Sequence, residues 1–209
     1  MVTLSAREIS KRYRDLLFSN FSWDFPESGM FVIKGANGSG KSTLLRILAC
    51  MEPPDTGEIR LMGEVVRDYR ARVYHKYARV ISFSFQEPNL LPTRVSKNLE
   101  VPTMVDESKL EELVEVLGLK KLLNSKATKI SGGEKKRVDL ARAMSRKTPI
   151  LLADEPLSFL DPEYVEVVTS LLREEAGHRL VIATTTGSDQ LTDAADTVID
   201  IMEYKRVRS

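Results

Sequence analysis

The sequence predicts an α/β fold built on a mostly parallel sheet. Three short apolar segments, at residues 30–33, 150–153 and 180–184, are each long enough for one buried strand. Each is followed by a segment with the character of a helix. Strands that alternate with helices are joined by crossovers and therefore pair in parallel. The 209 residues can bury a substantial core, so we expect a single domain over residues 1–209.

The N-terminal part alternates apolar and polar residues as strands do, from Val2 and Leu4 to Phe25, and a turn follows at residues 26–29. A Pro-Pro-Asp-Thr-Gly run at residues 53–57 then breaks the chain sharply. The further elements expected are strands at residues 58–62, 77–85 and 198–202, and helices after Pro162 and near Gln190.

A charged, leucine-spaced section begins near Ser96 and predicts a helical insertion over about residues 96–145. Ser108 and Glu111 have the spacing of a capping box, which predicts that a helix opens there. Its apolar face would consist of Leu110, Leu113, Val114 and Leu117. We expect this section to be inserted within the α/β domain.

A complete phosphate-binding loop reads Gly-Ala-Asn-Gly-Ser-Gly-Lys-Ser at residues 35–42. Glycines have no Cβ, so successive backbone N–H groups can curl around phosphate oxygens. Lys41 would reach the β- and γ-phosphates, and the Ser42 hydroxyl would ligate Mg²⁺. The residues expected to bind the nucleotide here are Gly35, Asn37, Gly38, Ser39, Gly40, Lys41, Ser42 and Thr43.

The segments around this loop argue against a chance match by a glycine-rich turn. The apolar strand at residues 30–33 leads into the loop, and a helix follows it. That helix would direct its positive N-terminal end at the anion. The core face of the helix is expected to carry Leu44, Leu45, Ile47 and Leu48.

Two carboxylates, Asp154 and Glu155, follow the apolar strand at residues 150–153. A strand that ends in a carboxylate delivers the charge to the crevice where α/β sheets bind ligands. Phosphoryl transfer needs a carboxylate near Mg²⁺, which suits Asp154. Glu155 suits the polarisation of an attacking water. An ordinary turn or helix start is the alternative, and the phosphate loop upstream disfavours it.

Ser131-Gly132-Gly133-Glu134 precedes a further helix, and Ser131 and Glu134 have capping-box spacing. The cap explains the helix but not the paired glycines, which weaken a helix start unless a backbone must approach something closely. Glycine N–H groups at a helix N-terminus form a second anion site. One chain cannot easily bring both sites onto one phosphate group, whereas a two-fold dimer could.

The composition restricts the class of partner. Lys and Arg total 31 against 30 for Asp and Glu, so the chain lacks the basic excess of a nucleic-acid binder, and the basic tail at residues 205–209 is short. The single cysteine, Cys50, fits a reducing compartment and a small buried position. No apolar run approaches the ~18 residues that span a bilayer. A membrane role would therefore require a partner.

The phosphate loop, Gln86, the 131–134 turn, the acid pair and Asp161 occur in the order and spacing of the ATP-binding cassette (ABC) ATPases. The chain resembles this family from about Tyr13 to Met202. The resemblance implies a P-loop NTPase of ABC type, with a mostly parallel core sheet, an antiparallel β part and a small helical insertion. It also implies ATP and Mg²⁺ as cofactors.

The resemblance assigns a role to each of these positions. Tyr13 matches an aromatic residue that stacks on adenine, although a tyrosine of the core is the alternative. Gln86 matches the glutamine that touches Mg²⁺ and the attacking water and reports to a transmembrane partner. Asp154 matches the acid on the Mg²⁺ side, and Glu155 matches the general base.

Two further matches concern a dimer. Ser131, Gly132 and Gly133 match the signature that clamps the γ-phosphate bound to the partner subunit. Glu134 stands where glutamine is common in the family, which is a mild change. Asp161 matches the aspartate loop that crosses the dimer interface.

The chain departs from the family after the strand at residues 180–184, where the family carries a histidine that contacts the γ-phosphate. Thr185 and Thr186 stand there instead, and Thr185 is assigned to the site. The histidines present, His75 and His178, are expected on the surface or in turns. A threonine hydroxyl can donate a hydrogen bond but lacks the same reach and charge. Losing such a group commonly lowers the rate by ~10²–10³, so turnover would be slow.

The resemblance therefore implies an ATPase subunit of a membrane transporter. Its partners would be a second copy of itself or a homologous ATPase subunit and an integral membrane permease, with no nucleic acid. It would lie at the cytoplasmic face of the membrane, held there through a partner. Residues 85–92, 98–102 and 152–156 look like the lipoprotein-release and macrolide-efflux branch.

Three other functions share some of these sequence features. A nucleotide-gated regulatory module with slow or negligible hydrolysis is the principal alternative, because the family histidine is missing. A DNA-repair ATPase would need a long coiled coil between Lys41 and Ser131, for which there is no room. A small nucleotide kinase has no use for the 131–134 turn.

Overall fold

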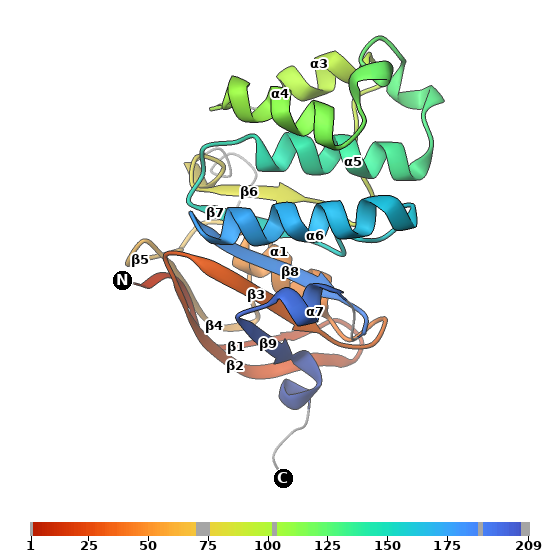
Figure 1. Cartoon of the computed structure of the whole chain (residues 1–209). Helices are drawn as coiled ribbons and strands as arrows, with labels where there is room; N and C mark the ends of the chain where they lie inside the picture. The colour runs from red at the N-terminus through yellow and green to blue at the C-terminus, as the bar shows by residue number, and fades with distance from the viewer. Residues whose placement is uncertain (1, 70–75, 102–103, 188–189, 206–209) are drawn as a thin grey trace.

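The computed structural model describes residues 2–69, 76–101, 104–187 and 190–205, which form two sheets with helices between and beside them (Figure 1). The larger sheet is parallel, in the order β6-β7-β8-β3-β9. Its strands are β3 (Gly29–Lys34), β6 (Ile81–Ser84), β7 (Ile150–Ala153), β8 (Leu180–Thr185) and β9 (Thr197–Asp200). This order places β8 between β3, which leads into the phosphate loop, and β7, which leads into the acid pair.

A smaller antiparallel sheet packs beside the parallel one, in the order β2-β1-β4-β5. Its strands are β1 (Val2–Arg12), β2 (Leu16–Pro26), β4 (Thr56–Leu61) and β5 (Glu64–Val65). Helix α1 (Lys41–Leu48) starts directly after the phosphate loop and lies between the two sheets (Figure 1). The predicted mixture of a parallel sheet and an antiparallel part is confirmed.

The two faces of the parallel sheet belong to different cores. Along β3, Phe31 and Ile33 pack with α1 and the antiparallel sheet, while Met30 and Val32 face the opposite side. This alternation follows from the period of two in a strand, and burial on both faces is typical of parallel sheets. Cys50 is buried in the first core, where burial raises the pKa of its thiol to about 12.

Helices cover the second face of the sheet (Figure 1). They are α5 (Gly132–Met144), α6 (Pro162–Ala176) and α7 (Gln190–Ala194), with α3 (Val95–Glu100) and α4 (Glu107–Val116) packed on α5. The short 3-10 turns η1 (Lys120–Leu122) and η2 (Ala127–Lys129) lie between α4 and α5 in the chain. In the described part of the chain, no helix has the length and apolar character needed to cross a bilayer.

Three predicted element boundaries were wrong. Asp106, not Ser108, caps α4, because its side chain accepts a hydrogen bond from the Lys109 N–H. The strand expected over residues 77–85 is confined to β6, and Tyr77 lies in a helical turn before it. β9 ends at Asp200, whose carboxylate accepts from the Met202 N–H and opens the 3-10 turn η3 (Ile201–Tyr204).

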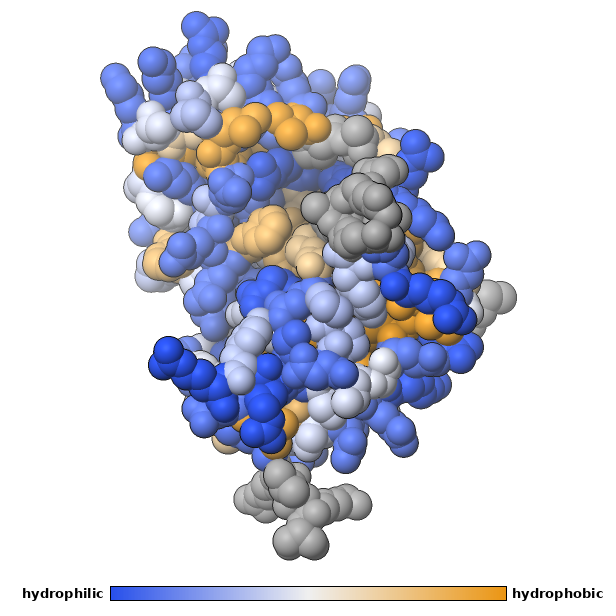
Figure 2. All heavy atoms as spheres, turned by 180° about the vertical axis from the view of Figure 1, so that it is seen from behind, coloured by the Kyte–Doolittle hydropathy of each residue, from blue (hydrophilic) through white to orange (hydrophobic). Residues whose placement is uncertain are grey.

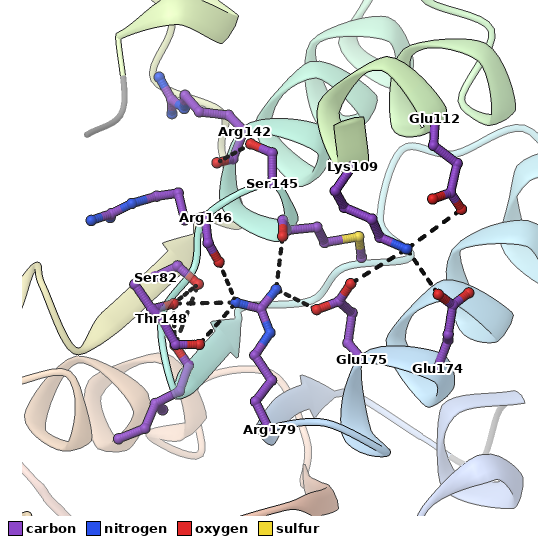
Figure 3. A network of polar contacts seen from close by, with 12 residues as sticks. Ser82, Lys109, Glu112, Arg142, Ser145, Arg146, Thr148, Glu174, Glu175 and Arg179 are labelled. Atoms are coloured by element: carbon purple, nitrogen blue, oxygen red, sulfur yellow. Dashed lines mark hydrogen bonds and ion pairs between the residues drawn. The ribbon is translucent and has the colours of Figure 1, made fainter. Parts of the chain in front are cut away.

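Arg179 ties the start of β8 to its surroundings (Figure 3). The side chain is 6% exposed, and its guanidinium donates to the carbonyl oxygens of Met144 and Arg146 at 2.9 and 2.8 Å. It also pairs with Glu175 of α6 at 2.5 Å. Lys109 of α4 joins the same network, at 2.9 Å from Glu174 and 3.7 Å from Glu175. The network therefore links α4, α6 and the connection between α5 and β7.

We expect Arg179→Met to lower the free energy of unfolding by about 3–5 kcal/mol, because Glu175 loses its nearest cation and buried carbonyl groups lose their donor. Urea denaturation measures the change. The matched control is Lys120→Met, whose ion pair with Glu115 is exposed and should contribute under about 1 kcal/mol. Equal unfolding midpoints for the two variants would contradict a structural role for Arg179.

Candidate functional site

The phosphate loop connects β3 to α1 and takes a conformation that requires glycine. Gly38 and Gly40 have φ angles of 72° and 101°, in the left-handed region that other residues rarely adopt. The loop is anchored where it leaves the sheet, because the Gly35 N–H donates to the Thr185 carbonyl at 3.2 Å. Asn37 is exposed on the loop, whereas Thr43 is buried in α1.

Lys41 folds back over its own loop. Its side chain is 4% exposed, and its ammonium donates to the carbonyl oxygens of Gly35 and Ala36 at 2.9 and 3.3 Å. The hydroxyl of Ser39 is buried, and among the described residues no group bonds to it. A glycine-rich loop with a lysine ammonium and an unsatisfied hydroxyl fits a ligand rich in acceptor oxygens, such as a phosphate.

Asp154 bonds to side chains from two other parts of the chain. It directly follows β7, is 5% exposed, and accepts hydrogen bonds from the Ser42 hydroxyl at 3.0 Å and the Thr184 hydroxyl at 2.6 Å. Ser42 comes from the helix after β3, and Thr184 comes from β8. The strand order β7-β8-β3 therefore brings the predicted loop serine and the predicted acid together.

Thr184 is a site residue that the sequence did not reveal. Besides donating to Asp154, its hydroxyl accepts from the Glu155 N–H at 2.9 Å. One hydroxyl thus contacts both residues of the acid pair. Its only sequence signal is a hydroxyl at the end of an otherwise apolar strand, and that pattern does not distinguish it from Thr185.

The carboxylate of Glu155 contacts two other predicted site residues, Gln86 and Lys41. Its carboxylate accepts from the Gln86 side-chain amide at 3.0 Å and lies 3.5 Å from the Lys41 ammonium. Its φ angle of 43° is unusual for a residue with a side chain and is a form of strain found at functional sites. The Ser158 hydroxyl donates to the Glu155 carbonyl at 2.7 Å and helps to hold this backbone.

The Ser131–Glu134 turn forms the predicted capping box. The Ser131 hydroxyl accepts from the Glu134 N–H at 3.2 Å, and the Glu134 carboxylate accepts from the Ser131 N–H at 2.7 Å. A Cβ on Gly133 would stand 2.6 Å from the Phe159 carbonyl oxygen. Glycine is therefore needed at this position because the backbone of Phe159, in the same chain, packs closely against it. Gly132 has open space where a Cβ would be. In the described part of the chain, no hydrogen bond joins this turn to Lys41, Gln86 or Glu155.

Tyr13 lies on the surface. It is 58% exposed, and its hydroxyl donates to Glu52 at 2.5 Å, so the alternative of a core tyrosine is wrong. The Lys11 ammonium stands 5.5 Å from the centre of its ring.

The two threonines at the end of β8 differ in exposure. Thr185 ends the strand and is 5% exposed, whereas Thr186 is exposed. His178 lies in an exposed turn, as predicted, and His75 is outside the described residues.

A buried lysine on α5 was not anticipated. Lys136 is wholly buried, and its ammonium donates to the carbonyl oxygens of Phe85 and Asp154 at 2.7 and 3.0 Å. Burial lowers the pKa of Lys136 to about 8, although the charges of Asp139, Asp154 and Glu155 act to raise it. Its sequence signal, a lysine and an aspartate three residues apart on a helix, normally indicates a solvated face.

A family model described as ABC transporter matches residues 18–158, which include the loop, Gln86, the glycine turn and the acid pair. The chain belongs to the ABC transporter family. It is an ATP-binding ATPase of that family, as the order and spacing of its motifs predicted.

Curated relatives place this cassette among transporter ATP-binding proteins. The lipoprotein-releasing system ATP-binding protein LolD 1 of Rhodopirellula baltica is 34% identical over 84% of this chain and 81% of its own length. The macrolide export ATP-binding/permease protein MacB of Azoarcus sp. is 36% identical over 84% of this chain, which spans 28% of MacB.

Solved structures give the same fold. The dimeric bacterial ABC transporter cassette MJ0796 superposes with a TM-score of 0.86 at 27% identity, covering 95% of this chain and 94% of its own. A dimeric post-hydrolysis state of the same cassette, bound to ADP and Pi, has a TM-score of 0.85.

We expect Lys41→Ala to abolish measurable binding of ATP in the presence of Mg²⁺, because charge-assisted hydrogen bonds to the phosphates are lost. Such bonds contribute about 1.5–3 kcal/mol each. Titration calorimetry measures the dissociation constant. Lys97→Ala is the control, since this lysine lies on α3 in an exposed pair with Glu100. Unchanged affinity in Lys41→Ala would contradict the loop assignment.

Proposed function

We propose that this ABC cassette binds and hydrolyses ATP at the edge of its parallel sheet and thereby drives a separate membrane protein. One observation carries the proposal: Lys41, Gln86 and Glu155 converge within hydrogen-bonding or ion-pair distance next to the contact between Ser42 and Asp154. These groups come from three separate segments of the chain. Together they include the cationic, hydroxyl, amide and carboxylate groups that phosphoryl transfer requires.

In this proposal the loop backbone and Lys41 hold the phosphates, and Tyr13 offers an exposed ring to the adenine. The site also fits Mg²⁺. Hydroxyl, amide and carboxylate oxygens are ligands that this cation prefers, and it usually takes one or two carboxylates together with substrate phosphates. Ser42 and Gln86 would hold the ion, with Asp154 beside it. When bound, the ion neutralises charge on the phosphates.

Glu155 has the position of a general base. Its carboxylate already binds the Gln86 amide and faces the Lys41 ammonium, so a water brought to this point would meet a proton acceptor and two orienting groups. Glu155 would take the proton of the attacking water as the water oxygen forms its bond to the γ-phosphorus and the bond to ADP breaks. This assignment gives Gln86 a positioning role and Glu155 the chemical one.

The Ser131–Gly133 turn is proposed to act on the nucleotide of a second subunit. It lies at the N-terminus of α5, whose 13 residues direct a positive end toward it, with Ser131 and Gly132 exposed. Among the residues that the structure describes, it makes no hydrogen bond to Lys41, Gln86 or Glu155 of its own subunit. Phe159, 60% exposed, lies against Gly133 and adds apolar surface there. The solved MJ0796 cassettes, which are dimers, support a second copy or a homologous ATPase as the mate.

The helical section, about residues 96–145 within the single domain, is proposed to receive the membrane partner. A groove of about 490 Å³ between α3 and α4 has Leu99, Leu110 and Val114 in its wall and acidic residues around it. Seen from behind, apolar side chains gather across the upper part of the molecule, where Figure 1 places this section (Figure 2). The names of LolD and MacB favour a permease of the lipoprotein-release or macrolide-export type, with the cassette at the cytoplasmic face.

The regulatory alternative has less support, because the relatives are named for release, export or import systems. Slow turnover remains an expectation of the transporter proposal, since the position after β8 still carries threonine.

We expect Glu155→Gln to form a stable dimer only when ATP is present, because the nucleotide is then held between the subunits without hydrolysis. Sedimentation velocity with and without ATP detects it. Glu166→Gln, at an exposed position of α6, is the control and should not accumulate the dimer. A Glu155→Gln protein that stays monomeric at saturating ATP would count against the two-subunit site.

A histidine introduced at the end of β8 is expected to raise turnover by up to about 10²–10³, since a missing donor at the γ-phosphate lowers the rate by about that much. Steady-state ATPase rates of Thr185→His and Thr186→His test this. Thr185→Val and Thr186→Val, which supply no donor, are the controls and should show no increase. If both histidine variants match the wild type, the missing histidine does not limit the rate.

A further inference from the structure

Lys136 links three motifs that lie far apart in the sequence. It is the fifth residue of α5, three residues after Gly133, and it is wholly buried. Its ammonium donates to the carbonyl oxygens of Phe85, 51 residues away, and of Asp154, 18 residues away. Burying an ammonium costs several kcal/mol unless it is well paired. The two carbonyl groups accept its hydrogen bonds, and the negative charges of Asp139, Asp154 and Glu155 favour its charged form.

The two carbonyl groups belong to the residues directly before Gln86 and Glu155, the two residues proposed to act on the attacking water. Phe85 directly precedes Gln86, and Asp154 directly precedes Glu155. One ammonium therefore sets the separation of the two backbone segments. The hydrogen bond of 3.0 Å between the Gln86 amide and the Glu155 carboxylate depends on that separation.

Asp139, one turn further along α5, holds the same segment from the other side. Its carboxylate accepts from the Ser84 hydroxyl at 2.8 Å and from the Phe85 N–H at 2.9 Å, and it pairs with Arg142 at 2.5 Å. Asp139 is wholly buried too. Phe85 is thus bound to α5 through both its N–H and its carbonyl, so α5 and the Gln86 segment are expected to move together.

We infer that Lys136 is a positioning residue that couples the Ser131–Gly133 turn to Gln86 and Glu155 of the same subunit. The inference rests on the proposed function, in which that turn contacts the nucleotide of the other subunit. A displacement of α5 when the turn meets a phosphate is carried by the Lys136 side chain to the two carbonyl groups. The geometry of Gln86 and Glu155 then depends on whether the second subunit has closed.

The test replaces Lys136 by methionine, which keeps most of the length and removes every donor. We expect kcat for ATP hydrolysis to fall at least 10-fold, with KM for ATP changed less than threefold. Lys136→Gln keeps two N–H donors on a shorter side chain and should give an intermediate kcat. Lys135→Met, at the neighbouring half-buried position of the same helix, is the matched control and should retain the wild-type kcat.

A second measurement separates positioning from assembly. In the Glu155→Gln background, Lys136→Met should still form the ATP-dependent dimer in sedimentation, because the turn itself is intact. A wild-type kcat in Lys136→Met would overturn the inference, and so would loss of that dimer in a folded protein. If circular dichroism shows Lys136→Met to be unfolded, Lys136→Gln decides, and wild-type kcat there overturns the inference.

Sedimentation of the parent Glu155→Gln protein, in which Lys136 is intact, tests the proposed function separately from the inference. If that protein forms no dimer with ATP, the two-subunit site and the coupling inference both fall. If the parent dimerises and only the Lys136 variants behave as wild type, the inference alone fails.

Discussion

The carboxylate of Asp154 is the constraint on which the site depends. It is nearly buried, yet it stands at the end of β7 with hydroxyl groups from the helix after β3 and from β8 bound to one of its oxygens. A buried carboxylate without such partners would be costly, so the hydroxyl groups stabilise it and are positioned by it. Through Ser42 it holds the phosphate loop in register with the sheet, and through Thr184 it fixes the backbone of Glu155.

Other buried charges extend this arrangement in two directions. The Lys41 ammonium lies 3.5 Å from the Glu155 carboxylate, and the Lys136 ammonium on α5 donates to the Asp154 carbonyl. At the opposite ends of the strands, Arg179 secures the start of β8 against α6. Each cation donates to backbone carbonyl groups, and Lys41 and Arg179 also pair with a carboxylate, so the position of each is set largely by the backbone. Such contacts restrict relative motion of the sheet and helices, which a site with several donors in fixed positions requires.

The division between a complete phosphate-binding edge and a separate glycine turn explains why one subunit is insufficient in the proposed function. Gly133 is small because the Phe159 carbonyl lies against it, whereas Gly132 faces open space. Only Gly132 therefore keeps room for an external group. In the proposed function, the threonines at the end of β8 leave the edge without the family histidine, so more of the transition-state stabilisation would come from Lys41, Gln86 and the second subunit.

The sequence by itself determined the phosphate loop, the acid pair, the capping box at Ser131 and the family, because each is encoded in a few neighbouring residues or in their spacing. It also predicted the strands at residues 30–33, 150–153 and 180–184, whose apolar runs reflect burial on both faces. Only the tertiary structure decided that Asp106 caps α4, that β9 ends at Asp200, and that Thr184 and Lys136 belong to the site. The first two depend on local competition between polar side chains for the backbone. The last two depend on partners brought close by the strand order and by the packing of α5, as with Lys136 and Phe85, 51 residues apart.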